Sequence, residues 1–338
     1  MSERSRDSAP PHDRPGPASR AAGRTALARL ALLVALFAAG PAAAQLAVER
    51  TPDGVAVRDG ATPILFYRTR PGPAPAEPWR LHYIHPLHAP DGTVLTEDRP
   101  DDHLHQRGVY SAWRRILLDG RQVADSWVMK DITYDVKGVS AARLADGSAR
   151  ISAEIDWQVR GLGVAVTEKV LIRAWPLDRS GARRVLVDSR LTARRDGLAL
   201  AGTDDDKGYS GPSIRFVRPD ALTFRTADGA PLTAALGAVE TGPEVRFEWL
   251  AGQGVPDWRV TARCRAGGRA WTRWVLRREL SMQTCAFPGR APQALRRGKP
   301  LWIELDLRIA PARPDQARVS SSRSPREASP SRALRSFR

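Results

Sequence analysis

The sequence has few cysteines and few lysines, and it has a single long apolar run and no long helical pattern. Each of these features excludes some classes of protein. Apolar residues do not recur at helical spacing over any long stretch, so a helical bundle is not expected. No internal repeat or interior linker is visible, which favours one domain. No later apolar run reaches the roughly 20 residues that a membrane-spanning helix needs, so the mature chain should have no span.

Cysteine occurs only at Cys264 and Cys285 among 338 residues. In an oxidising compartment the two could form a disulfide, which at this spacing would stabilise the fold by roughly 3 kcal/mol. The alternative is a pair of buried free thiols. The sequence leaves both alternatives open, because geometry decides whether two cysteines can pair.

The one long apolar run lies near the N-terminus and is typical of an export signal. It extends from Leu27 to Gly40 after a polar, arginine-rich start, and small residues follow at Ala42 and Ala44. This pattern predicts a Sec-type signal peptide over residues 1–44, with a membrane anchor as the alternative. The segment has no Arg-Arg pair for twin-arginine export and no cysteine for lipidation. The mature protein is therefore expected to be periplasmic or secreted.

Lysine is rare as well, since only five of the 53 basic residues are lysine, and the net charge is +16. The two ends carry +3 and +5 of this charge, which leaves +8 for residues 45–310. The tail, residues 311–338, is rich in Ser, Pro and Arg and is expected to be disordered. No nucleic-acid motif appears, so we expect no nucleic-acid partner, and carbohydrates or anionic sugars fit an exported basic chain better.

Alternation of apolar and polar residues dominates from Gln45 onward and predicts an all-β fold. The alternating segments are rich in Val and Ile and are separated by Gly, Pro and Asp turns, as in a β-sandwich or barrel. The expected strands lie within residues 46–68, 79–87, 148–159, 164–175, 183–193, 212–226, 243–251, 257–265, 269–280 and 299–309. We predict one large antiparallel β-sandwich over residues 45–310.

Histidine is scarce but concentrated, because five of the six histidines lie between His82 and His105. The densest stretch is DDHLHQRG, residues 101–108. If it is extended, His103, His105 and Arg107 project to one face. A divalent metal at His103 and His105 is one interpretation, but no third ligand with fixed spacing is visible, so no metal site is predicted.

The second interpretation of this stretch is an acid–base site, and the third is a hydrogen-bonded structural loop. Histidine titrates near neutrality and suits proton transfer, so His103 or His105 would be catalytic. Arg107 would bind a carboxylate or polar group with its bidentate fork, and Asp102 would fix the histidine tautomer. His85, at the end of the preceding expected strand, is a further candidate for substrate binding.

Other residues could complete such a site. The stretch GTDDDKGYSGPSIRF, residues 202–216, would supply Lys207, Tyr209 and Arg215 if it faces the histidine loop, and a solvated turn is the alternative. Glu168 lies in the middle of an expected strand, as a second acid–base group or as half of a surface ion pair. Trp113 follows the histidine loop and is a candidate platform for a sugar ring, while most aromatic residues belong to the core.

The run YIHPLHAPDGTVLTEDRPDDHLHQRGVYSAW resembles a bacterial family of unknown function commonly labelled "methane oxygenase PmoA". That family's pattern is Y-x-H-P, then P-x-G-x-x-(V/L)-T-x-D, then D-H-P-H-H-R-G. VDSRLTA and DKGYSGPSIRF resemble its later segments, so the resemblance covers about Ile64 to Arg215. Leu104 and Gln106 stand where the family has Pro and His, and its W-x-D-Y and D-H-P-x-N segments are not recognisable here.

This resemblance implies a galactose-mutarotase-like β-supersandwich and a role in carbohydrate metabolism. Methane oxidation is excluded as an interpretation, because subunits of the membrane methane monooxygenase are multi-span copper proteins. We therefore predict an exported carbohydrate-active protein that works by acid–base chemistry, as an epimerase, hydrolase or lyase. The alternative is a non-catalytic periplasmic protein that binds glycans or has a structural role, which the missing histidine at Gln106 favours.

Overall fold

The computed structural model describes residues 46–71, 80–250, 256–279 and 282–312. The predicted signal peptide and the predicted tail beyond residue 312 lie outside the described residues. All described residues belong to one compact unit, Ala44–Arg338. Its strands form two large sheets and one small sheet, and every strand pair is antiparallel. The prediction of an all-β antiparallel sandwich is confirmed, and the finer assignment to the mutarotase-like supersandwiches stays a prediction.

The first sheet has nine strands and carries the segments around the histidine stretch. In spatial order its strands are β1 (Leu46–Thr51), β2 (Gly54–Asp59), β3 (Thr62–Arg68), β4 (Tyr83–Leu87), β5 (Val109–Trp113), β13 (Ser210–Ile214), β21 (Gln283–Cys285), β20 (Arg273–Val275) and β16 (Val239–Glu240). The neighbours β5 and β13 each follow one of the two polar loops that the sequence singles out. The two strands pair antiparallel, so Val109 lies opposite Ile214 and Ser210 lies opposite Trp113. The two loops therefore leave the strand pair at opposite ends.

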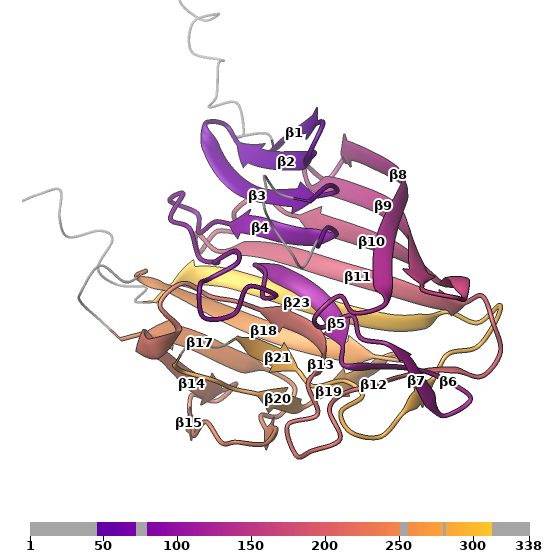
Figure 1. Cartoon of the computed structure of the whole chain (residues 1–338). Helices are drawn as coiled ribbons and strands as arrows, with labels where there is room; N and C mark the ends of the chain where they lie inside the picture. Colours follow the sequence, from indigo (N-terminus) through magenta and orange to yellow (C-terminus); the bar gives the residue numbers. More distant parts are fainter. Residues whose placement is uncertain (1–45, 72–79, 251–255, 280–281, 313–338) are drawn as a thin grey trace, which may run out of the picture. The chain divides into compact units, whose positions relative to one another are not determined.

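The second sheet has ten strands and contains the longest ones, which lie side by side in Figure 1. Its order is β15 (Pro231–Leu232), β14 (Leu222–Thr226), β17 (Val245–Trp249), β18 (Trp258–Ala266), β23 (Leu301–Pro311), β11 (Arg183–Ala193), β10 (Gly163–Ala174), β9 (Ala149–Val159) and β8 (Ile132–Arg143), with β19 (Arg269–Trp271) beside β18.

A small third sheet of four strands and one short helix complete the described elements. The sheet order is β22 (Gln293–Ala294), β12 (Leu198–Ala201), β6 (Arg115–Leu118) and β7 (Arg121–Ala124). Among the described residues the helical element is the 3₁₀ helix η1 (Pro219–Ala221). No helix in the described part of the chain is both long and apolar enough to cross a membrane.

The core lies between the two large sheets, because alternate side chains of their strands point to opposite faces. On β9 every second residue from Ala149 to Val159 is buried, including Ile151, Ile155 and Trp157, while the residues between them are half-buried or exposed. Apolar residues from both large sheets belong to one continuous cluster. Cys264 of β18 and Cys285 of β21 form a disulfide that links the two sheets. Of the two alternatives that the sequence left open, the disulfide is therefore the one present.

The start of β5 requires glycine at position 108. A Cβ atom at Gly108 would lie 2.1 Å from the carbonyl oxygen of Ile84 in β4, which no side chain can occupy. The last residue of the DDHLHQRG stretch is therefore fixed by the close approach of two backbones. It anchors the end of the histidine loop against β4.

Candidate functional site

The histidine stretch is folded into consecutive turns rather than extended. The backbone N–H of His103 donates to the carbonyl of Pro100, and that of Gln106 donates to the carbonyl of His103, both at 2.9 Å. Alternation therefore does not apply, and the predicted common face of His103, His105 and Arg107 is wrong. The two histidines still meet, with ring centroids 5.7 Å apart in an edge-to-face arrangement. Arg107 points elsewhere, because it is 1% exposed and donates to the carbonyl of Leu104.

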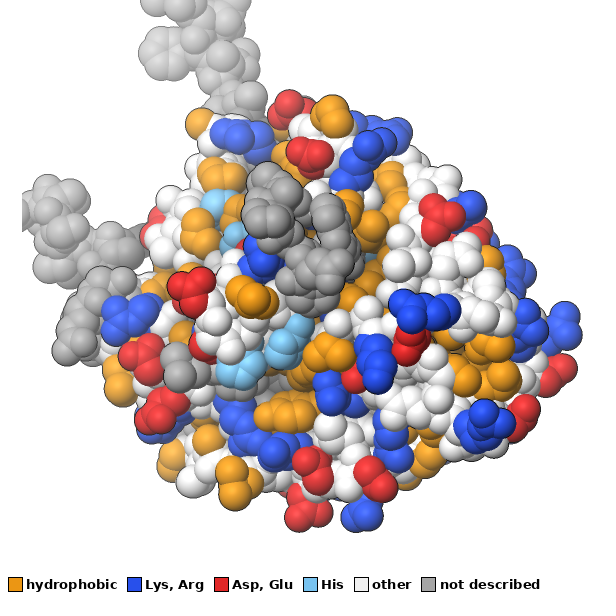
Figure 2. Space-filling view, viewed as in Figure 1, with side chains coloured by type: hydrophobic (Ala, Val, Ile, Leu, Met, Phe, Trp, Pro, Cys, Tyr) orange, Lys and Arg blue, Asp and Glu red, His pale blue; other side chains and the backbone are white. Residues whose placement is uncertain are grey.

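The two loops singled out from the sequence meet around one surface cavity of about 280 Å³, which we call the histidine hollow. The histidine loop contributes His103, His105 and Gln106 to its wall. The second loop contributes Thr203, Asp205, Lys207 and Tyr209, and Arg114 and Trp127 complete the lining. On this face, histidine side chains are bordered by Lys and Arg side chains and by apolar ones (Figure 2). The sequence analysis expected Lys207 and Tyr209 to join the site if their loop faces the histidine loop, and both residues line the hollow.

The second loop is closed by its own hydrogen bonds. The Thr203 hydroxyl donates to Asp205 and accepts from the backbone N–H of Tyr209 at 3.0 Å. Gly202 allows the closure, because a Cβ atom there would lie 2.2 Å from the carbonyl oxygen of Gly208. This closure holds Lys207 and Tyr209 at the end of the loop, beside the histidines.

One wall of the hollow is aromatic and held by a buried carboxylate. The rings of Trp127 and Tyr209 lie 5.1 Å apart between centroids. Asp125 accepts from the backbone N–H of Trp127 at 2.8 Å and pairs with Arg114 at 3.2 Å. Burial raises the pKa of Asp125, while the charge of Arg114 opposes this shift. Asp125 therefore fixes both an aromatic and a cationic lining residue from behind.

The electrostatic environment keeps His105 neutral at pH 7. Burial lowers its pKa from 6.5 to about 4, and the nearby charges of His103, Arg80 and Arg114 act in the same direction. The neighbouring His103 contacts a carboxylate instead, with Nδ1 2.7 Å from Oδ2 of Asp102. A neutral imidazole can accept a proton, and a carboxylate on Nδ1 orients the second imidazole. The hollow thus offers a neutral imidazole beside a second imidazole that a carboxylate orients.

Burial of Asp102 by itself raises its pKa, but the hydrogen bond with His103 and the charge of Arg215 outweigh it and lower the pKa. Arg215 is 2% exposed and lies behind the hollow rather than in it. It binds Glu97 at 2.8 Å, Gln106 at 3.0 Å and Asp102 at 3.2 Å. With every side of its guanidinium engaged, Arg215 holds the histidine loop and is not placed to bind a ligand.

Three further residues predicted for the site lie outside the hollow. Trp113 is fully buried and donates its indole N–H to the carbonyl of Phe287 at 3.0 Å, so its ring offers no exposed platform. Nδ1 of His85 lies 3.1 Å from the Thr96 hydroxyl, and burial lowers the pKa of His85 to about 4. Glu168 points into the core from β10 and is 1% exposed. It is neither a surface ion pair nor a wall of the hollow.

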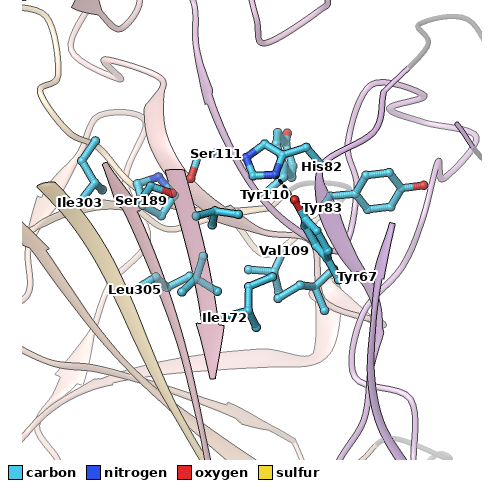
Figure 3. A pocket seen from close by; sticks show the side chains of 14 residues that line it. Tyr67, His82, Tyr83, Val109, Tyr110, Ser111, Ile172, Ser189, Ile303 and Leu305 are labelled. Atoms are coloured by element: carbon cyan, nitrogen blue, oxygen red, sulfur yellow. Dashed lines mark hydrogen bonds between the residues drawn. The ribbon is translucent and has the colours of Figure 1, made fainter. Parts of the chain in front are cut away.

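Glu168 belongs to a buried polar cluster between the large sheets. One carboxylate oxygen lies 3.2 Å from Nε2 of His82 and accepts from the indole of Trp157 at 3.0 Å. Nδ1 of the same histidine lies 2.7 Å from the Tyr67 hydroxyl (Figure 3). His82 and Tyr67 border an interior cavity of about 20 Å³, which has room for about one water molecule. The backbone of His82 has a positive φ of 63°, a conformation that L residues adopt less readily.

Arg114 and Trp127 were not predicted as lining residues, and Thr203 and Asp205 were predicted only as members of the polar stretch that carries Lys207. Arg114 directly follows Trp113, and strand alternation across β5 and β6 could have placed it on the opposite side from that buried ring. Trp127 lies in a turn after β7, where no periodicity exists. Within the described residues, no group of three or more His, Cys, Asp or Glu side chains is arranged to hold a metal ion.

A family model matches residues 54–323 of the chain. The chain belongs to DUF6807, a family of unknown function. The matched range includes the whole histidine hollow. The resemblance to the family labelled methane oxygenase stays a prediction, since the match carries a different description. No curated protein matches the chain.

One similar solved structure is the galactosidase domain of the alpha-galactosidase-sucrose kinase AgaSK. It has 9% sequence identity and a TM-score of 0.33, and the match covers 79% of this chain. The chain spans only 40% of the length of that structure. A likeness this distant assigns no activity to the DUF6807 chain.

Proposed function

We propose that the histidine hollow binds an anionic sugar and transfers a proton at it. The observation that carries the proposal is one hollow in which a neutral His105 stands beside His103, with Arg114 and Lys207 in the same lining. Proton transfer needs a group that can accept a proton near neutral pH. Two cations within reach suit a carboxylate or sulfate.

The reaction that these groups support is removal of the proton on the carbon next to a sugar carboxylate. His105 accepts that proton, and Arg114 and Lys207 stabilise the negative charge that spreads onto the carboxylate. Return of a proton to the opposite face gives an epimer. Alternatively, the electrons of the broken C–H bond form a carbon–carbon double bond, the adjacent C–O bond breaks, and His103 gives a proton to the departing oxygen. The first outcome is epimerase chemistry and the second is lyase chemistry.

A glycoside hydrolase mechanism has less support from the lining. Most glycoside hydrolases use two carboxyl groups that face each other across the scissile bond. Among the described lining residues, Asp205 supplies a carboxylate, and it is engaged with Thr203 and the backbone of its own loop. Glu168, which the sequence nominated as a second acid–base group, is in the core. The epimerase and lyase forms of the proposal are therefore preferred.

The alternative is a non-catalytic glycan-binding protein, and Gln106 is the observation that favours it. Gln106 lines the hollow where the resembled pattern has a histidine, and its side-chain oxygen accepts from the buried Arg215. An amide cannot exchange a proton near neutral pH. Under this alternative the hollow keeps its binding groups without turnover.

Export to the periplasm or beyond the cell is part of the proposal. The Cys264–Cys285 disulfide supports it, because such bonds persist mainly in oxidising compartments. Fractionation of cells that express the full chain tests this directly. Recovery of the uncleaved chain in the cytoplasm, with both cysteines reduced, would contradict export.

The catalytic proposal is tested by hydrogen exchange. The protein is incubated in D₂O with galacturonate, glucuronate and their oligomers, and NMR follows deuterium at the carbon next to the carboxylate. At pH 8 we expect exchange with the wild type and at least a hundredfold slower exchange with His105→Gln. Binding at that pH should be unchanged, because His105 is neutral there with or without the ligand. Binding without exchange in the wild type would establish the glycan-binding alternative instead.

A further inference from the structure

A second surface cavity lies on the other side of the loop that carries Lys207. It has a volume of about 150 Å³ and is lined by Trp271, Arg273, Arg290 and Asp206, among others, and we call it the Trp271 hollow. Asp205 and Lys207 line both this cavity and the histidine hollow. A single loop therefore forms the wall between two adjacent cavities.

The wall is thin because glycines let the loop rest on its neighbour. The backbone N–H of Gly202 donates to the carbonyl of Gly289 at 2.7 Å. A Cβ atom on Gly208 would lie 2.9 Å from the Cα of Gly289, so any side chain there would push the loop away. Lys207 lies on this wall, which forms a ridge between the two cavities. Its ammonium lies 3.8 Å from Asp205, a loose contact that leaves the ammonium able to bind a ligand from either side.

The chemistry of the Trp271 hollow matches that of a sugar subsite. Trp271 is half-buried, and its indole N–H is fixed to the carbonyl of Ala286 at 3.0 Å, which orients the ring. An oriented, partly exposed aromatic ring can cover the apolar face of a sugar. Arg273 is exposed beside it, and Arg290 pairs with Asp204 at 2.8 Å at the rim. Cationic groups thus accompany the aromatic ring in this cavity as in the histidine hollow.

We infer that the two hollows are adjacent subsites for one anionic oligosaccharide, which crosses the ridge at Lys207. This inference rests on the proposed function and names its substrate class as a chain of at least two sugar units with carboxylate or sulfate groups. The histidine hollow holds the unit at which the proton moves. The Trp271 hollow holds the neighbouring unit and selects for chain length.

The test measures affinity against chain length by calorimetry with the full mature protein. The probes are galacturonate and its dimer and trimer, with kappa-carrageenan disaccharide and tetrasaccharide as a second arm. The carrageenan oligomers carry sulfate and no carboxylate, so this arm separates carboxylate from sulfate recognition. We expect the trimer to bind at least tenfold more tightly than the monomer. Arg273→Ala should weaken trimer binding about three- to tenfold and leave monomer binding unchanged.

Arg269→Ala is the matched control, because Arg269 is an exposed arginine on β19 that lines neither hollow. Equal affinity for monomer and trimer in both arms would overturn the inference, and so would an Arg273→Ala effect that is the same for both lengths. In either case monomer binding and proton exchange would still uphold the proposed function. Absence of binding by every probe would reject the proposed function together with the inference.

Discussion

Binding of a sugar carboxylate in the histidine hollow should become weaker as the pH rises, because the bound carboxylate favours the protonated form of His105. In the free protein, burial and the neighbouring positive charges hold the pKa of this imidazole at about 4. A carboxylate about 4 Å from it contributes about 4 kcal/mol at an effective dielectric constant near 20. That interaction raises the pKa of His105 back toward the neutral range, and above this raised pKa the bound imidazole is neutral and can accept the substrate proton.

The direction of this pH dependence follows from the protonation of His105 in the free protein and in the complex. Above pH 4 the free imidazole is neutral, whereas in the complex it stays protonated to a higher pH, so binding takes up a proton. Affinity should fall by up to tenfold for each pH unit between about 5 and 7. The 4 kcal/mol limits the total change to roughly a thousandfold.

Calorimetry with galacturonate at several pH values, in buffers of different ionisation enthalpy, measures both the affinity and the protons taken up. His105→Gln should remove the pH dependence, and His103→Gln serves as the control for the second imidazole. Galactose, which has no charge, should bind without proton uptake. A dissociation constant that is flat from pH 5 to 7, or a slope that survives in His105→Gln, would refute the reasoning.

Three further perturbations test the frame around the site. Replacing Cys264 and Cys285 together by serine should lower the free energy of unfolding by about 3 kcal/mol in urea titrations, and the wild type under reducing conditions should match the variant. Glu168→Ala leaves the buried His82 without its carboxylate and should cost about 3–5 kcal/mol by calorimetry. The contacts with His82 lower the pKa of Glu168 despite its burial, so its contribution should be lost as the pH falls through that lowered pKa. Gly108→Ala should cost at least about 1–3 kcal/mol, whereas Gly138→Ala, with open space at its Cβ, should be tolerated.

The fold class could be predicted from the sequence because one face of each long strand is buried, which produces an alternation of apolar and polar residues. β9 alternates without interruption and falls within a predicted strand, and β23 alternates from Trp302 to Ile309 and begins within another predicted strand. β8 was missed although it has 12 residues. Its register shifts between Val136 and Gly138, which breaks the period of two, and much of its surface is half-buried or exposed. Short strands such as β5 and β6 carry too few residues for alternation to be recognised.

The site was readable only in part, because its residues come from loops. The polar composition of the stretches around His103 and Lys207 pointed to the two loops that enclose the hollow. The turns of the loop decide which side chains face the ligand. Period-two alternation predicted that Arg107 would lie beside the histidines, but the loop forms turns and Arg107 is buried. The roles assigned to Arg107 and Arg215 were plausible for exposed arginines. Sequence alone carries no information about their burial.

The buried arginines explain how a loop can hold two imidazoles in a fixed arrangement. Arg215 reaches Glu97, Asp102 and Gln106, and Asp102 in turn holds His103, so the orientation of one imidazole is set through a chain of charge-assisted hydrogen bonds. Each of these groups is engaged before any ligand arrives, and preorganisation of this kind is what positioned chemistry requires. Gln106 takes part in this frame through an oxygen acceptor. Gln106 has no titratable group but supports the frame that holds His103, so the proposed proton transfer in the hollow depends on the pair His103 and His105.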